Sequence, residues 1–467
     1  MQLKEATVGP IVGYTDSKHT RLWFRGTLEA PTPDTYNRCF GALRLREKNG
    51  KWQSVMHNKM SPNFDMTAVF VLQGLKAQTQ YEYQVGWIIL DTELEGFSSI
   101  PDTTFVFPEK IFSFRSGKNK GSTSRSYVAG SCRYLLKLFG LNIFDDRGDK
   151  MFQSILKHAE TNGLDGVVMV GDQIYADDLN FVSPDTRINE FFERYRQAFK
   201  QPYIRELMSR YPTYMILDDH EIEDNWPSNA DVVDWKTLYP AAIHAYLTYQ
   251  ASHSPLYEVS SESRIEGVPN KLWYSFSDGL IDWFFMDSRT ERSAPGRPVK
   301  MISDVQMDGL LNHLKSNKGG YKFVVTSVPM FPDFTSETGD KWMGYPEQRE
   351  VILSFIKKEK IKKVYFLSGD VHCSFCAELT SQSDPDFRVY QIVSSSFFWP
   401  YPHMSASGCI IGPVKSIVEP QDYVATLRSE VYSDDNFSVI DVKKESVTVS
   451  FYDRKNKPLG GSTVLKS

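Results

Sequence analysis

The sequence lacks the features that would mark a disulfide-bonded, exported or membrane-spanning protein. Only 5 of its 467 residues are cysteine, and this odd, scattered set is not a disulfide framework. No apolar run approaches the roughly 20 residues that cross a bilayer. Residues 1–15 have neither the basic nor the apolar region of a signal peptide. We therefore expect a cytoplasmic protein, or an exported one if a leader has been removed.

An excess of positive charge is also missing. The 53 basic and 58 acidic residues give a formal net charge of −5, which offers no electrostatic basis for binding nucleic acid or an anionic membrane. The hydrophobic fraction of 41% and the charged fraction of 24% are those of a soluble globular protein. A chain of 467 residues is too long for one ordinary core, so two or three domains are expected.

The N-terminal part, residues 1–116, predicts an all-β sandwich. Alternating runs such as TRLWFRG and MTAVFVLQG are separated by turn residues, and LQGLKAQTQYEYQV (72–85) is typical of the corner of an immunoglobulin-like sandwich. Residues 117–126, GKNKGSTSRS, contain almost nothing to bury, so they are expected to form a linker. The predicted domains are therefore 1–116 and 127–467.

From residue 127 onward, buried strands alternate with amphipathic helices. Apolar strands are predicted at 127–130, 165–170, 212–217, 282–287, 322–328 and 363–369. Helices are predicted at 151–160, with Asp149 as its cap and Gly163 past its end, and at 345–358. Strands without polar alternation, interleaved with helices, indicate an α/β fold whose sheet is covered on both faces.

Nearly every one of these strands runs directly into polar residues of the kinds that bind metals. The endings are Ser131-Cys132-Arg133, then Asp172 with Tyr175, Asp177 and Asp178, then Asp218 to Asn225, Asp287-Ser288-Arg289, and Asp370-Val371-His372. Open α/β sheets bind ligands at the carboxyl ends of their strands, where such side chains converge. Burying several carboxylates without a counter-charge would cost several kcal/mol each, so the pattern predicts bound cations.

The five motifs at these endings together resemble the PhoD-like alkaline phosphatases, a family of metallophosphoesterases. They are GSCRY (130–134), GDQIYADD (171–178), DDHEIEDN (218–225), MDSRTER (286–292) and SGDVHCS (368–374). The resemblance implies a four-layer α/β/β/α metallophosphoesterase domain with a C-terminal extension, behind an N-terminal sandwich of the immunoglobulin or fibronectin-III type.

The resemblance also implies roles for particular residues. It gives a trivalent iron (Fe3+) to Cys132, Asp172, Tyr175 and His372, and it gives calcium (Ca2+) or another divalent ion to Asp172, Asp219, Asn225 and Asp370. Asp224 stands where the family has asparagine, so whether Asp219, Asn225 or both reach the second metal is open.

Three further residues have implied catalytic roles. His220 is expected to protonate the leaving alkoxide or to stabilise the phosphate, although it could instead orient Asp219. Arg133 and Arg289 are candidate phosphate clamps, because a guanidinium binds phosphate through two hydrogen bonds; Arg289 could alternatively pair with Asp287.

Three segments near these motifs have no assigned role. FFWPY (397–401) could wall the substrate's leaving group or cap the core. KWMGY (341–345) is a similar aromatic loop with an available lysine. The apolar stretch LLKLFGLNIF (135–144) is expected to pack on its own domain.

The sequence thus predicts hydrolysis of phosphoric mono- or diesters through attack by a metal-bound hydroxide. One alternative is a dedicated phosphodiesterase acting on lipid, nucleotide or polymer substrates. Another, of a different class, is a non-catalytic phosphate-binding or scaffold protein. The predicted partner is a small phosphoester; no transmembrane segment is indicated, and the pattern does not address oligomeric state.

Overall fold

The chain forms two compact units in the computed structural model. The structure describes residues 1–27, 38–119, 121–135, 137–138, 141–142, 146–180, 184–293, 299–317 and 319–466. The first unit comprises 1–119, 188–214 and 244–269, and the second comprises 120–187, 215–243 and 270–467. The prediction for 135–144 falls largely outside the described residues.

The first unit contains two antiparallel sheets that enclose a shared core. One has the order β1 (Val8–Thr15), β2 (Thr20–Arg25), β5 (Thr67–Leu72), and the other β4 (Met56–Met60), β3 (Arg38–Glu47), β6 (Gln80–Leu90), β7 (Phe112–Arg115). Buried side chains of both sheets, among them Phe24, Phe70 and Tyr83, form one cluster. The predicted strand-rich N-terminal region is therefore confirmed.

Residues 188–214 and 244–269 belong to the first unit, although the sequence pattern groups them with 127–467. They supply α3 (Ile188–Phe199), α4 (Pro202–Met208) and a π-helix (Leu247–Ala251). Trp23 of β2 donates a hydrogen bond to the Thr248 carbonyl at 2.9 Å, and Tyr83 of β6 donates one to the Ser209 carbonyl at 2.7 Å. Such contacts between distant segments leave no local signal in the sequence, and the predicted boundaries at 116 and 127 stay predictions.

The second unit is built on two mixed sheets. The six-stranded sheet has the order β12 (Thr213–Ile216), β11 (Gly166–Val170), β8 (Ser124–Gly130), β25 (Asn436–Lys443), β26 (Ser446–Asp453), β27 (Pro458–Leu465). The eight-stranded sheet has the order β15 (Tyr274–Asp278), β16 (Ile281–Phe285), β17 (Tyr321–Val325), β19 (Val364–Ser368), β21 (Arg388–Val393), β20 (Phe375–Ser381), β24 (Tyr423–Leu427), β23 (Gly412–Pro413). Each of the six predicted buried strands corresponds to one of these strands.

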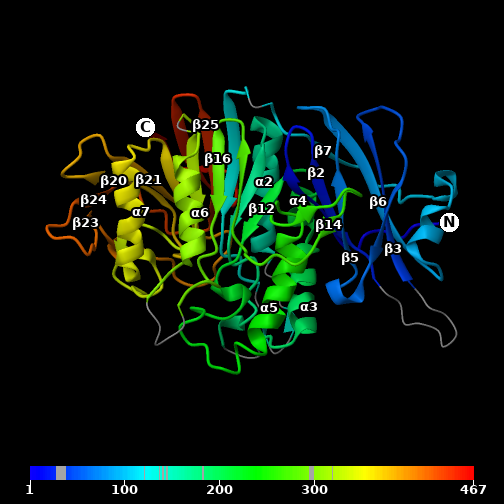
Figure 1. The fold of residues 1–467 in the computed structure, drawn as a ribbon, viewed down its shortest axis with the longest axis horizontal. Coiled ribbons are helices and arrows are strands. Elements are labelled where there is room, and N and C mark those ends of the chain that lie inside the picture. Colours follow the sequence, from blue (N-terminus) through cyan, green and yellow to red (C-terminus); the bar gives the residue numbers. More distant parts are fainter. Residues whose placement is uncertain are drawn as a thin grey trace. The chain divides into compact units, whose positions relative to one another are not determined.

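Helices pack on these sheets, and the sheets contact each other. The helices α6 (Asp304–Lys315) and α7 (Pro346–Lys358) share a core cluster with β17 and β19, and Figure 1 shows them side by side on the eight-stranded sheet. Tyr127 of β8 meets Trp283 of β16 with ring centroids 4.9 Å apart, which joins the two sheets. The predicted α/β class is confirmed.

The helix α2 (Arg147–Asn162) packs on the six-stranded sheet, where the His158 ring contacts the Tyr452 ring of β26 at 4.7 Å. Gly163 ends this helix with a φ of 79°, as expected for its lack of a β-carbon. The prediction of Asp149 as the cap is wrong: Asp146 holds that position, and Asp149 is buried inside the first turn.

Candidate functional site

Five buried strands each end two residues before a polar side chain. The pairs of last strand residue and polar residue are Gly130 and Cys132, Val170 and Asp172, Ile216 and Asp218, Phe285 and Asp287, and Ser368 and Asp370. β8 and β11 are parallel neighbours, and β16, β17 and β19 form a second parallel set. The carboxyl ends of parallel strands share one edge of a sheet, which brings these side chains together.

Most of the predicted metal ligands have left-handed backbone conformations. Cys132, Asp172, Asn225, Asp370 and His372 have φ values of 54°, 53°, 57°, 71° and 49°. A side chain with a β-carbon rarely adopts such values, and residues held in them cluster at functional sites. Five of the seven predicted metal residues share this feature.

Asp172 contacts two of its predicted partners. Its Oδ2 accepts hydrogen bonds from the Cys132 thiol at 3.2 Å and from the Tyr175 hydroxyl at 3.4 Å. Its Oδ1 is buried and has no hydrogen-bond partner among the described residues. Burial, followed by the nearby Cys132 and Asp218, raises the pKa of Asp172 well above its usual value. Without a cation, the carboxylate form is therefore strongly disfavoured here.

His372 joins the same group through a serine. The Ser395 hydroxyl accepts a hydrogen bond from the His372 backbone N–H at 3.1 Å and donates one to the Cys132 sulfur at 3.1 Å. The His372 ring stacks on Trp399 with centroids 3.8 Å apart. Burial lowers the pKa of His372 to about 3, so the ring is neutral near pH 7 and suited to ligate a metal.

These donors fit a metal ion. Within the part of the chain that the structure describes, Asp172 Oδ1, Asp219 Oδ1 and His372 Nε2 are buried without hydrogen-bond partners, although most buried polar groups in proteins have one. Burial also raises the pKa of the Cys132 thiol to about 12, so a thiolate there requires a cation. Sulfur, imidazole and phenol donors together suit iron or zinc.

The carboxylates form two overlapping groups of potential ligands. The first is Asp172, Asp219 and His220, the second is Asp218, Asp219 and Asp370, and within each group one donor atom per residue lies within 4.8 Å of the others. Asn225 is placed beside the second group, because its backbone N–H donates to Asp219 Oδ2 at 2.7 Å. The structure thus brings together all seven residues predicted to bind metals, while their roles as ligands stay predictions.

His220 is held by a carboxylate that the sequence analysis did not assign. Its Nδ1 lies 2.8 Å from Asp177 Oδ2, and its ring stacks on Tyr175 with centroids 4.2 Å apart. Burial opposes protonation, but Asp219 and Asp177 outweigh it and raise the pKa of His220 well above its usual value. The ring is therefore held in a fixed orientation and can carry a proton to give away.

The two predicted phosphate clamps are both fully buried. The Arg133 guanidinium lies over the Phe152 ring at 5.3 Å, and its backbone N–H donates to the Asp172 carbonyl at 2.9 Å. Arg289 donates its backbone N–H to Asp287 Oδ1 at 3.2 Å, but its guanidinium pairs with other carboxylates. Those partners are Asp218, Asp219, Asp340 and Asp370. The clamp roles stay predictions.

A cavity of about 370 Å³ lies at this group of residues. Neither Arg133 nor Arg289 is among its described lining residues, which are Asp172, Leu179, Asp219, His220, Asp224, Asn225, Phe334, Ser336, Glu337, Lys341, Asp370, Val371, His372, Trp399, Pro402, His403 and Met404.

The FFWPY segment contributes to both the core and the cavity. Phe397 and Phe398 are buried and cap the core, as one of the two alternatives for this segment expects. Trp399 lines the cavity, and the Tyr401 side chain is exposed next to it. A wall for the substrate's leaving group stays a prediction for Trp399 and Tyr401.

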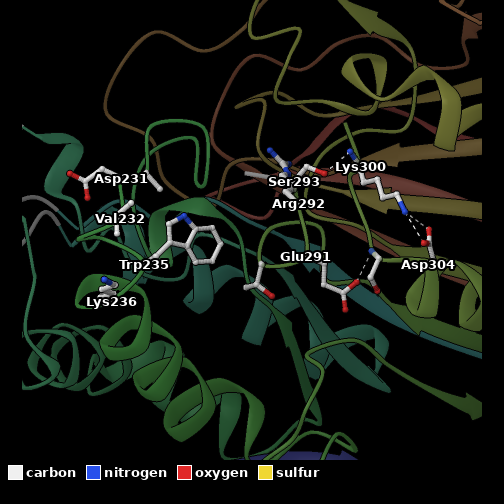
Figure 2. Close-up of a pocket in the computed structure, with 12 residues that line it drawn as sticks. Asp231, Val232, Trp235, Lys236, Glu291, Arg292, Ser293, Lys300 and Asp304 are labelled. Atoms are coloured by element: carbon white, nitrogen blue, oxygen red, sulfur yellow. Dashed lines mark hydrogen bonds and ion pairs between the residues drawn. The ribbon is translucent and has the colours of Figure 1, made fainter. Parts of the chain in front are cut away.

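A larger hollow of about 920 Å³ lies elsewhere in the second unit (Figure 2). Lys300 and Asp304 at its edge form an ion pair at 2.7 Å, and the Trp235 ring faces it. Neither group of potential metal ligands in the described part of the chain includes a residue that lines this hollow. The smaller cavity is therefore the candidate site.

Four residues of the site were missed or left without a role by the sequence analysis: Asp177, Asp340, Lys341 and Ser395. Asp177 and Lys341 stand in quoted motifs, so their positions were noted but not their partners. Asp340 lies in a loop, and Ser395 follows β21 in a run of three serines. Nothing local distinguishes either one from an ordinary surface residue.

The comparisons with known proteins agree with this geometry. A family model described as PhoD-like phosphatase matches residues 145–451, which is more than half of the chain. The chain therefore belongs to the PhoD-like phosphatase family, and the resemblance predicted from the five motifs is confirmed.

Two relatives give the extent of the similarity. Alkaline phosphatase D of Bacillus subtilis (strain 168) is 26% identical over 272 residues, which are 49% of this chain and 44% of the relative. This chain thus matches less than half of that protein's length. A solved structure titled "Structure of PhoD" superposes with a TM-score of 0.71 at 16% identity, covering 98% of this chain and 88% of that one. At that identity the likeness establishes the fold alone.

Proposed function

We propose that this protein hydrolyses phosphoric mono- or diesters with the help of bound metal ions. The observation that carries the proposal is a set of buried ligand atoms around one cavity that have no hydrogen-bond partner among the described residues: Asp172 Oδ1, Asp219 Oδ1 and His372 Nε2. Asp219 Oδ1 also lies 3.4 Å from Arg289 Nη2. Membership of a phosphatase family supports the proposal. Most buried polar groups in proteins are hydrogen-bonded, so atoms without such a bond beside a cavity are available to a bound ion.

Two sets of residues would hold the ions. Cys132, Asp172, Tyr175 and His372 would hold iron, and Asp172 with Asp219 and Asn225 would hold a divalent ion such as calcium. Ions of this kind polarise a phosphoryl oxygen and lower the pKa of bound water to about 7. The left-handed backbone at Cys132, Asp172, Asn225 and His372 supports this assignment, because such strain persists where function requires it.

His220 would act as the general acid. Its position at the cavity, its contact with Asp177 and its raised pKa all favour a protonated ring close to a bound ester. A cation bound to Asp172 and Asp219 would cancel part of their charge and bring that pKa down toward neutrality. The proton would then pass from His220 to the departing alkoxide.

The finer architecture is proposed with the function. The order α2, six-stranded sheet, eight-stranded sheet, α6 with α7 supports a four-layer α/β/β/α domain. The two sheets of the first unit support a sandwich of the immunoglobulin or fibronectin-III type. Among the described residues, no helix is both long and apolar enough to cross a bilayer. Location in the cytoplasm stays a prediction from the sequence.

The test combines elemental analysis of the purified protein with rates on p-nitrophenyl phosphate and bis-p-nitrophenyl phosphate at several pH values. We expect iron, a divalent metal and turnover of at least one ester. A faster rate on the diester would favour the dedicated phosphodiesterase. A protein that binds no metal, or hydrolyses no ester at any pH, would overturn the proposal.

A variant separates the general acid from the metal site. His220→Asn should lower kcat by about 10² to 10⁴-fold on esters with poor leaving groups, because protonation of the alkoxide is lost. The loss should be smaller on p-nitrophenyl esters, whose leaving group departs unaided. Metal content should stay at the wild-type level, and an equal loss on both kinds of ester would contradict the acid role.

A further inference from the structure

Lys341 has a fixed position at the candidate site. It precedes a short 3-10 helix (Trp342–Gly344), and Trp342 is buried with its indole N–H donating to the Thr326 hydroxyl at 3.1 Å. Thr326 directly follows β17, the strand beside β19, whose end leads into Asp370. The aromatic anchor therefore holds the lysine at the same sheet edge as the predicted metal ligands.

The Lys341 ammonium is surrounded by carboxylates. Its Nζ lies 2.6 Å from Asp370 Oδ2, 2.9 Å from Glu337 Oε2 and 3.4 Å from Asp340 Oδ2, and its side chain is 2% exposed. An ammonium has three N–H donors, and here it has three anionic partners. Two of its N–H groups donate hydrogen bonds, to Glu337 and Asp340, and Asp370 is its nearest carboxylate, so the surroundings of this lysine favour a role toward the protein's own carboxylates.

Asp370 is engaged by protein cations on both oxygens. Oδ2 forms the close ion pair with Lys341, although the contact lacks hydrogen-bond geometry, and Oδ1 accepts a hydrogen bond from Arg289 Nη2 at 3.2 Å. Asp172 differs, because its Oδ1 has neither a hydrogen bond nor an ion pair among the described residues. An incoming ion would therefore have to displace a protein cation at Asp370 but not at Asp172 Oδ1.

The neighbouring charges continue this pattern. Arg289 also pairs with Asp218 and Asp340, and Arg292 pairs with Asp340. Five carboxylates (Asp218, Asp219, Glu337, Asp340 and Asp370) thus face three cationic side chains (Arg289, Arg292 and Lys341). Around Asp370, these three cationic side chains therefore supply much of the positive charge that bound ions would otherwise supply.

We propose that Lys341 acts as a built-in cation that replaces a divalent metal ion at Asp370. Asp370 is then the counter-ion of Lys341 rather than a metal ligand, and no divalent ion binds at Asp370 while the lysine is present. The inference rests on the proposed function for the remaining ions, which Asp172, Asp219 and Asn225 would hold. A covalently attached ammonium cannot be removed by a chelator, whereas a bound calcium ion can.

The test counts calcium per chain in the wild type and in Lys341→Met, which keeps an unbranched side chain one atom shorter and removes the charge. Full-length proteins stripped with chelator and reloaded with iron are equilibrated with CaCl₂, and bound calcium and iron are measured by elemental analysis. We expect Lys341→Met to bind about one calcium ion more than the wild type, because Asp370, Glu337 and Asp340 are oxygen ligands of the kind calcium prefers. The matched control is Lys300→Met, which removes an exposed lysine paired with Asp304 and should leave the count unchanged.

Asp370→Asn gives a second test that does not need Lys341→Met to fold. If Asp370 is the counter-ion of Lys341, Asp370→Asn should bind as much calcium as the wild type. The double variant with Lys341→Met should lack the extra calcium ion that Lys341→Met alone binds. Loss of a calcium ion in Asp370→Asn alone, or equal counts in the wild type and Lys341→Met, would overturn the role of Lys341. A wild-type protein that takes up no iron would instead contradict the proposed function.

Discussion

Two buried aspartates show opposite ways of accommodating a negative charge in this chain. Asp65, in the first unit, is contacted by Arg25, Arg196 and Tyr249, and both of its carboxylate oxygens accept hydrogen bonds. Asp172, in the second unit, has a thiol and a phenol on one oxygen and no hydrogen bond on the other. The first carboxylate is neutralised by the protein itself, and the second is not.

The comparison separates a structural carboxylate from one that is arranged for a ligand. Asp65 joins β2, α3 and the π-helix through Arg25, Arg196 and the Tyr249 hydroxyl, so its charge serves to hold three segments together. Burying an unneutralised carboxylate lowers the stability of the fold by several kcal/mol, so it is expected where a bound cation offsets that loss. Asp172 lines a cavity, so an ion from solvent can reach it.

The largest expected effect comes from removing the charge of Asp172. Asp172→Asn should lower kcat on p-nitrophenyl esters by about a thousandfold or more, because both proposed ions share this carboxylate. Iron and calcium, measured in the same samples, should fall with it. The control is Asp287→Asn, another buried aspartate two residues past a strand, which should stay within about tenfold of the wild type. Near-normal turnover in Asp172→Asn would contradict the interpretation of Asp172 as a metal ligand.

Removing the charge of Asp65 should affect stability instead of catalysis. Asp65→Asn should lower the free energy of unfolding by about 3–5 kcal/mol, because two arginines lose their partner in a mostly buried site. Urea unfolding measures the loss, and metal content should not change. Glu82→Gln is the control: it removes a more exposed pair with Arg46 at 2.7 Å and should cost about 1 kcal/mol or less. Equal losses in both variants would contradict the structural role of Asp65.

The smallest expected effect comes from the buried His253. Burial lowers the pKa of His253 to about 4, whereas the carboxylates around His220 raise the pKa of that histidine. Because the folded pKa of His253 lies below its unfolded value of about 6.5, its neutral form stabilises the fold above pH 6.5, and this contribution is lost as the pH falls toward 4.

This pH dependence can be isolated with His253→Gln. Between pH 7.5 and pH 5 the wild type should lose about 2 kcal/mol more unfolding free energy than the variant, as measured by urea titration. His313 and His372 also have lowered pKa values, so the difference between the two proteins, not the wild-type slope, reports on His253. Identical pH dependence in both would contradict the shift.

Much of the fold could be predicted because its signals are local. The strand at 165–170 and the helix at 345–358 have apolar patterns that fit one kind of element, and β11 (Gly166–Val170) and α7 (Pro346–Lys358) lie within those ranges. The grouping of 188–214 with the first unit could not be predicted in this way. It depends on contacts such as that between Arg196 and Asp65, which are 131 residues apart.

The candidate site was predictable only as far as its motifs extend. Cys132, Asp172 and His372 follow buried strands, and that position alone marks them. The Lys341 partners depend on how the loop of residues 336–341 folds back on the sheet edge, and Ser395 depends on a left-handed His372 and a neighbouring strand. The pattern of residues along a single sequence does not show which distant residues come into contact.

By itself, the sequence determined the kind of elements this chain forms, the order in which they follow and the polar residues at which its strands end, because hydrophobic periodicity and strand ends are local properties. Only the tertiary structure decided which charges meet. It gave Asp65 two arginines, gave Asp370 a lysine, and left Asp172 and His372 with unpartnered atoms beside a cavity. The reason is physical: electrostatic compensation depends on distance in space, and residues far apart in sequence set that distance only when the chain is folded.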